Sequence, residues 1–397
     1  MRTLYRGGRV FDGAGKSLDG HGVLVEDKHI RRVAPLAEFE GFSDKTVDTS
    51  GGTLMPGVID THLHLLLTGG PDQLGPLATL SPIALGLGAL KHAQDALMGG
   101  VTSVRDVGGK DFIEMQVRDA INRGDFIGPT IQGSGHIICI AGGHAYRIGR
   151  QADGPEEIRK AVREQLRGGA DLIKVMATGG MSSAGSDPGA SQFLPEEINA
   201  AVAEAQRWGK ATAAHAHGRD GVMNAVNAGI TSIEHGAFID EQCIEAMLKK
   251  GVFLVPTLSV SHWTEQNMKR GTIPQFIIDN TMKTRELRTK NFRAFYEAGG
   301  KIAMGTDGGT QYNYHCLSAY ELALMVDYGM KPVDALVAGN AAAAELMRMP
   351  DRGKIAEGCF ADLLVVDGDP TVDILSAALA ERHRLVVKNG VEAKRRA

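Results

Sequence analysis

The stretch Met98-Gly99-Gly100-Val101-Thr102-Ser103-Val104 contains the pattern that decides the fold. An amphipathic helical segment ends at one or two glycines, and a short apolar run of β type follows at once. Glycine supplies the left-handed conformation that ends a helix, so the pattern predicts a helix joined directly to a buried strand. Between about residue 84 and residue 310 it recurs before the predicted strands 171–175, 211–214, 230–233, 252–255 and 301–304.

Two further segments, 57–60 and the weaker 130–132, also have the pattern of strands. The sum is about eight strands separated by helices, which is the count of a closed (β/α)8 barrel. A doubly wound open sheet is the alternative, but no glycine-rich phosphate loop follows the first strand. We therefore predict an α/β protein with a TIM barrel over residues 56–349.

Both ends of the chain have a different pattern. Residues 1–55 and 350–397 contain short alternating strands with turn signals at Asp12-Gly13, Asp19-Gly20, Asp367-Gly368 and Asn389-Gly390. Together they predict a small β-sandwich domain that is built from the N- and C-terminal segments and flanks the barrel.

Composition excludes several classes of protein. The 397 residues carry 43 Lys+Arg against 47 Asp+Glu, a net charge of −4, which argues against a general polyanion binder. We find no signal-peptide core and no apolar run long enough to span a membrane, so we expect a cytoplasmic protein without nucleic-acid or membrane partners. The four cysteines, Cys139, Cys243, Cys316 and Cys359, have neither zinc-knuckle nor disulfide-framework spacing.

A pair of histidines ends the first predicted barrel strand, in Asp60-Thr61-His62-Leu63-His64. Successive strand residues point to opposite faces, so His62 and His64 face the barrel interior together. They lie near the C-terminal mouth, where active sites of such barrels form. Neutral imidazoles bind zinc and other divalent transition metals, and the pair therefore predicts half of a metal site.

Other candidate ligands sit at the ends of other predicted strands, namely Lys174, His215, His235 and Asp307. Histidines that merely pack in a core would not be expected to follow strand ends in this way. Lys174 lies within an apolar strand, where a cation is costly to bury. Reaction with CO2 would turn it into an anionic oxygen ligand, whereas pairing with a carboxylate or reaching out of the barrel mouth are the alternatives.

These segments resemble the metal-dependent amidohydrolase superfamily, and within it the imidazolonepropionase-related branch that contains dipeptidases, carboxypeptidases and other amidases. The resemblance covers essentially the whole chain. Its carriers are the segments 55–64, Gly142-Gly143-His144, 173–180, Ala214-His215-Ala216-His217-Gly218, Ile233-Glu234-His235-Gly236 and Gly305-Thr306-Asp307.

The resemblance implies a binuclear metal centre, with zinc as the expected metal. In this pattern His62, His64 and Asp307 hold one ion, His215 and His235 hold a second, and N6-carboxylated Lys174 bridges the two. A hydroxide between two divalent cations is a strong nucleophile at neutral pH. Asp307 would take its proton and pass it to the leaving amine, so Asp307 is expected to be catalytic as well.

Further candidates for contacts with a substrate lie on the loops of the barrel mouth. The resemblance places His144 near the substrate carbonyl or carboxylate, where it could stabilise developing charge, although a plain loop histidine is the alternative. An arginine nearby could hold a substrate carboxylate, or form a structural ion pair. The set of substrate-binding candidates is His144, Tyr146, Arg147, Arg150, His217 and the weaker His136.

The predicted activity is hydrolysis of the amide bond of a dipeptide or an N-acyl amino acid, in the manner of an Xaa-Pro dipeptidase or a carboxypeptidase. Some prolidase-like relatives carry a tyrosine where this chain has His217, which weakens the expectation of strict Xaa-Pro specificity. The alternatives are a cyclic-amide (imidazolone or hydantoin) hydrolase, a xenobiotic aryl-amide hydrolase and a non-catalytic barrel. We expect a small-molecule substrate and a homo-oligomer.

Several residues are expected around the mouth without a defined role. The segment 181–189 is rich in small turn residues, as expected of a mobile loop over the site or of an inert connection. Phe193, Trp263 and Tyr312 are candidate walls of an apolar pocket. His262 and His315 are expected in the later loops of the mouth.

Overall fold

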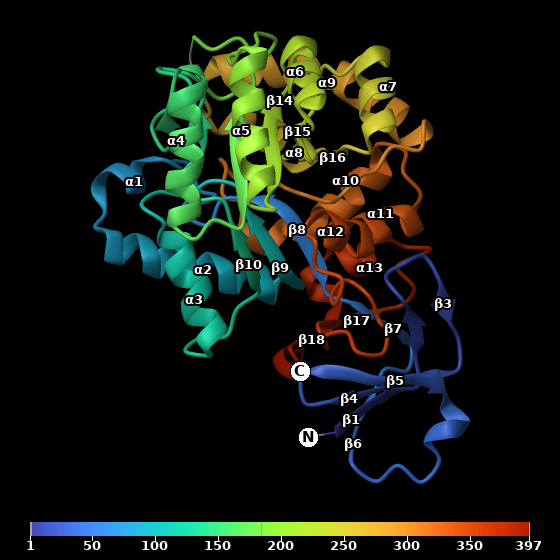
Figure 1. Ribbon diagram of the computed structural model, residues 1–397. Coiled ribbons are helices and arrows are strands. Elements are labelled where there is room, and N and C mark those ends of the chain that lie inside the picture. The colour runs from blue at the N-terminus through green and yellow to red at the C-terminus, as the bar shows by residue number, and fades with distance from the viewer. Residues whose placement is uncertain (1, 184, 397) are drawn as a thin grey trace.

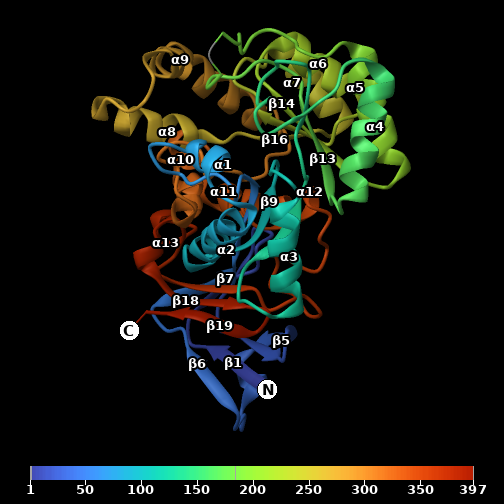
Figure 2. The ribbon, with the colours of Figure 1, turned by 90° about the vertical axis from the view of Figure 1, so that its left-hand side faces the viewer.

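The computed structural model describes residues 2–183 and 185–396. A barrel of strands and helices makes up the larger part of the molecule, and two sheets lie at one end of it (Figure 1). Both ends of the chain lie in this smaller part (Figures 1 and 2). The site described below lies in the barrel.

Parallel strands form most of the barrel, and seven of them match predicted strands, whereas the short β11 and β12 do not. They run in two sheets, β10-β9-β8 and β11-β13-β14-β15-β16, the second of which also carries the short β12. The gap between the sheets is bridged by the Asp171 N–H, which donates to the Gly133 carbonyl at 2.8 Å. The strands are β8 (Val58–Leu63), β9 (Val101–Asp106), β10 (Thr130–Gly133), β11 (Ile138–Cys139), β12 (Arg150–Gln151), β13 (Leu172–Met176), β14 (Ala211–Ala216), β15 (Ser232–His235) and β16 (Phe253–Val255).

The eighth position of the barrel is filled by residues 301–306, which form no regular strand. Only an isolated parallel bridge joins Leu254 and Ile302. The Met304 N–H donates to the Ala338 carbonyl instead of a neighbouring strand, and the Thr306 N–H donates to the Asp60 carboxylate. The barrel nevertheless closes here, because the Thr61 N–H donates to the Met304 carbonyl at 2.9 Å.

Helices alternate with these strands as the repeated pattern predicts, and a glycine with positive φ precedes each repeated strand. These glycines are Gly100, Gly169, Gly209, Gly229, Gly251 and Gly299. The helices are α1 (Gly75–Thr79), α2 (Pro82–Met98), α3 (Ile113–Arg123), α4 (Gly154–Arg167), α5 (Pro195–Arg207), α6 (Arg219–Ala228), α7 (Glu241–Lys250), α8 (Leu258–Asn267), α9 (Gln275–Glu297), α10 (Glu321–Asp327), α11 (Pro332–Ala338), α12 (Ala341–Leu346) and α13 (Leu375–Ala378). The TIM barrel is therefore confirmed.

The two ends of the chain form two sheets beside the barrel, of order β5-β4-β1-β6 and β19-β18-β17-β7-β2-β3. Their strands are β1 (Arg2–Arg6), β2 (Arg9–Phe11), β3 (Ser17–Leu18), β4 (His21–Glu26), β5 (His29–Pro35), β6 (Lys45–Asp48), β7 (Gly52–Pro56), β17 (Leu363–Asp367), β18 (His383–Lys388) and β19 (Val391–Arg395). The division into domains at residues 55/56 and 349/350 stays a prediction.

The six-stranded sheet lies between the barrel and the four-stranded sheet (Figures 1 and 2). Alternate residues of β17 pack toward the barrel and toward the four-stranded sheet, because successive strand side chains point to opposite faces. Leu364 and Val366 belong to the large barrel core, whereas Leu363 and Val365 pack with Val23 of β4. The two faces of β17 therefore contribute to two separate apolar clusters, one with the barrel and one with the four-stranded sheet. No helix of the described part of the chain is long and apolar enough to cross a membrane.

Candidate active site

A cavity of about 410 Å³ lies at the carboxyl ends of the barrel strands. Every predicted metal ligand lines it, although these residues come from five strands or strand ends and are as much as 245 positions apart in the chain (62 to 307). The six residues are His62 of β8, His64 just after β8, Lys174 of β13, His215 of β14, His235 of β15 and Asp307 after the eighth position. The fold therefore brings together the whole predicted set.

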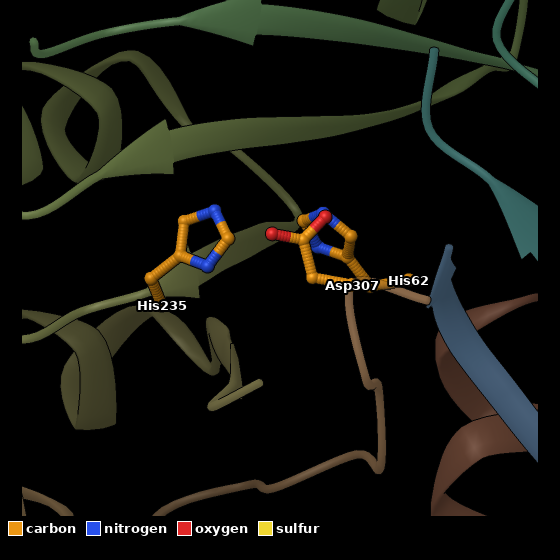
Figure 3. A group of neighbouring side chains, drawn as sticks. All are labelled: His62, His235 and Asp307. Carbon is orange, nitrogen blue, oxygen red and sulfur yellow. The ribbon is translucent and has the colours of Figure 1, made fainter. Parts of the chain in front are cut away.

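Asp307 lies between the two histidines of the first strand. Its Oδ1 is 3.4 Å from the His62 Nε2 and 3.2 Å from the His64 Nε2. Candidate ligand atoms of His62, His235 and Asp307 all lie within 4.8 Å of one another (Figure 3). Burial raises the pKa of Asp307, but its contacts with His62 and His64 outweigh burial and hold that pKa well below its ordinary value. The aspartate is therefore an anion at neutral pH.

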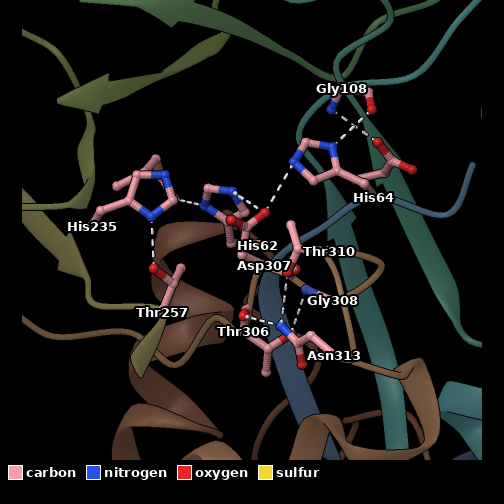
Figure 4. A network of polar contacts seen from close by, with 12 residues as sticks. His62, His64, Gly108, His235, Thr257, Thr306, Asp307, Gly308, Thr310 and Asn313 are labelled. Atoms are coloured by element: carbon pink, nitrogen blue, oxygen red, sulfur yellow. Dashed lines mark hydrogen bonds and ion pairs between the residues drawn. The ribbon is translucent and has the colours of Figure 1, made fainter. Parts of the chain in front are cut away.

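Three of the histidines are oriented through the ring nitrogen that points away from Asp307. His62 Nδ1 lies 2.7 Å from the Glu234 carboxylate, and His64 Nδ1 lies 2.8 Å from the Gly108 carbonyl. His235 Nδ1 lies 2.6 Å from the Thr257 hydroxyl (Figure 4). In a neutral ring, an acceptor at Nδ1 places the proton on that nitrogen and makes the Nε2 lone pair available to a metal ion. This arrangement fits a divalent metal ion bound by neutral imidazoles and a carboxylate.

Glu234 lies between His62 and the buried Arg105. Its carboxylate accepts from Arg105 Nη2 at 3.0 and 3.1 Å, and both side chains are fully buried. Burial raises the pKa of Glu234, but the charge of Arg105 and the hydrogen bond from His62 hold it far below its ordinary value. The carboxylate therefore remains an acceptor for the His62 ring, with its charge balanced by Arg105.

The last three positions of the barrel each place a residue with left-handed backbone at the mouth. His235 has φ 73°, Thr257 has φ 48° and Asp307 has φ 58°. Non-glycine residues adopt this conformation at a cost of about 1 kcal/mol or more, and such strain concentrates at functional sites. At Asp307 the turn is held by its N–H, which donates to the His62 carbonyl at 2.7 Å.

Lys174 and His215 complete the buried side of the cavity. Lys174 is 2% exposed, and burial lowers its pKa to about 8 against the opposing effect of Glu234 and Asp307. The His215 Nε2 lies 3.0 Å from the Gly179 carbonyl, which leaves its Nδ1 free. Its ring centroid lies 4.7 Å from that of His235, so the two histidines are neighbours in the site.

His144 reaches the same cavity from the third loop of the mouth. Its Nδ1 lies 2.6 Å from the Ser183 hydroxyl, and burial lowers its pKa to about 4, so the ring is neutral. A Cβ at Gly180 would lie 2.2 Å from the His144 ring, and only glycine allows this approach. Met181, Ser182 and Ser183 of the small-residue loop also line the cavity. Ala184 of that loop lies outside the described residues.

Among the remaining candidates for substrate contacts, Tyr146, Arg147 and His217 line the cavity. His136 and Arg150 do not. The His136 ring lies between the Asp111 N–H and the Ile148 carbonyl, and the Arg150 guanidinium pairs with Glu164 at 2.8 Å. Both side chains are thus held by other partners and are outside the cavity lining.

The three candidate aromatic walls are not among the residues that line the cavity. Phe193 is buried beside the start of α5, and the Trp263 ring packs at a tilt against that of Tyr320. The hydroxyl of Tyr312 bonds that of Thr272. Apolar walls come from other residues, namely Leu67, Leu74, Ile137, Ile148, Met176, Met181, Val260, Phe276 and Ile277. His262 and His315 are likewise outside the lining: His262 packs on Trp263, and His315 stacks on His92.

Sequence reasoning missed Glu234, Arg105, Thr257 and the arginine of α9, Arg288. A signal existed for the first two, because each is a charged residue within a buried strand and such residues need partners. Thr257 gave no signal, because its hydroxyl is placed by an unusual backbone conformation.

A comparison with known families matches residues 53–392 to the model described as the amidohydrolase family. The chain belongs to this family. It is 32% identical over 413 residues to an ochratoxinase of Aspergillus niger, across 94% of this chain and 82% of that one. It is 24% identical over 418 residues to the imidazolonepropionase of Anaeromyxobacter sp. (strain K), across 94% and 90%.

A solved structure of an Xaa-Pro dipeptidase with bound methionine is also similar to this amidohydrolase. It superimposes with a TM-score of 0.89 at 31% identity, across 99% of each chain. The amidohydrolase is therefore a hydrolase that acts on C–N bonds. Enzymes of this family act on small molecules and are generally metal-dependent, in agreement with the His and Asp group of the cavity.

The hydroxyl of Thr257 provides a direct test of how the amidohydrolase orients a ligand. We expect Thr257→Val to lower the affinity for zinc about 10-fold, since it removes the partner of the His235 Nδ1 and leaves the backbone shape unchanged. Zinc competition with a chromogenic chelator measures the change. Thr264→Val is the matched control, because that hydroxyl bonds only the Val260 carbonyl of its own helix. Equal affinities in the two variants would contradict the assignment.

Proposed function

We propose that this amidohydrolase uses two divalent metal ions to cleave the amide bond of an N-acyl amino acid or a dipeptide. The observation that carries the proposal is the single cavity that gathers four histidines, Asp307 and the buried Lys174. The donor set suits zinc, and a carboxylated lysine would supply an anionic oxygen between two ions. His62, His64 and Asp307 would hold one ion, and His215 and His235 the other, with Lys174 shared.

Bound metal would supply two kinds of chemistry, a lowered pKa of water and polarisation of the amide carbonyl. Asp307 then moves the proton. Its carboxylate is anionic and lies at the centre of the histidine pair, so it can accept a proton from the attacking water. It returns this proton to the amine nitrogen as the C–N bond breaks and the new C–O bond remains. The products are a carboxylic acid and an amine.

His144 stabilises the charge that develops on the carbonyl oxygen. Its ring is neutral at pH 7, because burial lowers its pKa to about 4. The Ser183 hydroxyl holds Nδ1, which leaves Nε2–H to donate a hydrogen bond toward the cavity. A hydrogen bond from a neutral donor that is already in place stabilises the carbonyl oxygen most when negative charge develops on that oxygen.

The lining of the cavity narrows the class of substrate. Most of the exposed surface of the wall is apolar, with Phe276 and Met181 among the larger side chains, which favours an apolar acyl or amino-acid side chain. Among the described residues that line the cavity, Asp307 is the only carboxylate. A basic side chain on the substrate would lack an anionic partner there, so we propose apolar N-acyl amino acids or dipeptides as the substrates.

A second candidate is hydrolysis of a cyclic or aryl amide. The apolar wall accommodates an aromatic ring, and the similarity to an ochratoxinase and an imidazolonepropionase supports this alternative. Linear and cyclic substrates give different products. Cleavage of a linear amide releases two molecules, whereas ring opening leaves both product groups in one molecule. A product analysis therefore separates the two functions.

The test is a screen of N-acyl amino acids, dipeptides, aryl amides and hydantoins with zinc-reconstituted protein. Released amine is measured for the linear amides and formation of the N-carbamoyl amino acid for the hydantoins, and metal per chain is determined on the same sample. We expect turnover of linear amides with apolar groups and two metal ions per chain. Turnover of hydantoins alone would replace the proposal by the cyclic-amide function. Loaded protein that converts none of the compounds would contradict the proposed substrate class.

A further inference from the structure

Arg288 is a buried cation in the wall of the active-site cavity. It lies on α9 among Thr281, Thr284 and Asn291, which form the buried stripe of that helix. Its side chain is 6% exposed and lines the cavity together with Thr281 and His217. An arginine on the buried face of a helix is costly, because a guanidinium that leaves water needs both charge compensation and hydrogen bonds.

The contacts of Arg288 leave half of its guanidinium without a hydrogen bond. Nη1 donates to the Thr284 hydroxyl at 3.3 Å. Nε and Nη2 are buried and donate to no described residue. The nearest carboxylate oxygen belongs to Glu265, at 3.7 Å from Nη2, which is beyond hydrogen-bond distance. Glu265 is also shared with the exposed Arg285, at 3.6 Å.

The free pair of nitrogens has the geometry that a carboxylate requires. Nε and Nη2 form one edge of the planar guanidinium, and two parallel N–H groups on such an edge bind both oxygens of a carboxylate. Arg288 lines the same cavity as His217, which lies two positions from the proposed ligand His215.

We infer that Arg288 binds the free carboxylate of the substrate's amino-acid part through Nε and Nη2. This inference rests on the proposed function and makes it more specific: the substrate is an amide with an apolar acyl group and a free carboxylate. The substrate supplies the hydrogen bonds that the buried cation lacks. Arg147, predicted from the sequence for this role, is exposed at the rim, and Arg150 is paired with Glu164.

The alternative is that Arg288 serves only to hold α9 against α8 through Glu265. The two roles differ in what they do to substrate selection. A positioning residue changes the stability of the two helices and affects all substrates equally. A carboxylate-binding residue affects only substrates that carry the carboxylate, and it acts mainly on KM because the contact is made before and during the reaction.

The experiment compares N-benzoyl-L-phenylalanine with N-benzoylphenethylamine, which lacks only the carboxylate. Zinc-loaded wild type, Arg288→Met, Arg288→Lys and Arg285→Met are assayed with both. Arg285 is the matched control, since it is on the same helix and pairs with the same Glu265 but is outside the cavity lining. Thermal unfolding and metal content are measured for each variant to verify that the fold and the metal site are intact.

We expect Arg288→Met to raise KM for N-benzoyl-L-phenylalanine about 10- to 100-fold, with little change for the analogue, because hydrogen bonds to a charged group are lost. Arg288→Lys should recover part of the loss, and Arg285→Met should match the wild type. An equal loss with both compounds, or the same loss in Arg285→Met, would overturn the inference.

Failure of the proposed function has a different signature. If the wild type hydrolyses neither compound, N-benzoyl-L-phenylalanine stays intact when it is mixed with the protein. Its binding to the zinc-loaded protein can then be measured by titration calorimetry. Binding that weakens in Arg288→Met but not in Arg285→Met would then support the carboxylate site while the substrate assignment fails. Unchanged or absent binding would overturn the carboxylate site itself.

Discussion

Asp307→Asn is expected to lower kcat by about 100- to 10,000-fold with N-acyl amino acids, because the amide cannot accept the proton of the attacking water. The asparagine keeps an oxygen near His62 and His64, which lie 3.4 and 3.2 Å from the carboxylate of Asp307. Metal content should therefore fall far less than turnover. The measurement is kcat by release of amine, with metal per chain on the same preparation.

The control for Asp307→Asn is Asp220→Asn, which removes an exposed carboxylate at the start of α6. It should retain the kcat of the wild type. Turnover within about tenfold of the wild type in Asp307→Asn would sink the proton-transfer role. If both metal and activity disappear, Asp307 is needed chiefly to hold the metal, and the catalytic role must be assigned elsewhere.

Lys174→Ala is expected to release most of one or both metal ions and to abolish turnover. A buried amine surrounded by imidazoles is an unfavourable neighbour for a divalent cation, whereas its carboxylated form supplies negative charge and two oxygen atoms. Carboxylation joins the amine nitrogen to the carbon of CO2 and releases a proton. Elemental analysis of the purified variant measures metal per chain, and the mass of the intact wild-type Lys174 peptide under non-acidic conditions reports the added CO2.

The second buried lysine provides a matched control. Lys388 is 5% exposed and bonds Asp362 and Thr130, each at 2.7 Å, outside the cavity. Lys388→Ala should lower stability but leave metal per chain unchanged, since breaking a buried pair leaves a charge uncompensated. Formate or propionate should restore part of the metal and the turnover in Lys174→Ala only. Two ions per chain in Lys174→Ala without added carboxylate would refute the shared-ligand assignment.

The sequence pattern is sufficient to predict that the candidate metal ligands lie together. Each of these ligands lies in the second half of a short apolar strand or just beyond it, namely His62, Lys174, His215, His235 and Asp307. In a barrel of parallel strands these ends meet at one mouth, so the assembly of the set follows from topology. The eighth strand was less predictable, because residues 301–306 bond to Asp60 and Ala338 as well as to neighbouring strands. These partners are remote in sequence.

Residues on loops behaved differently from residues on strands. Tyr146, Arg147, Arg150 and His136 lie close together in the sequence, yet only the first two line the cavity. Their directions depend on side-chain partners, such as Glu164 for Arg150 and the Ile148 carbonyl for His136. A strand determines side-chain direction through its period of two, but a loop has no such period.

The sequence by itself determined the barrel, the two terminal β segments and the set of metal-ligating candidates. Backbone propensity and strand periodicity are local properties, and they place each ligand at a strand end without knowledge of its neighbours. Only the tertiary structure decided that Glu234 orients His62 and that Thr257 orients His235. It also decided that Arg288 lines the cavity and that its Nε and Nη2 have no hydrogen-bond partner among the described residues. Those contacts join residues from different elements, and their directions depend on packing that no single segment encodes.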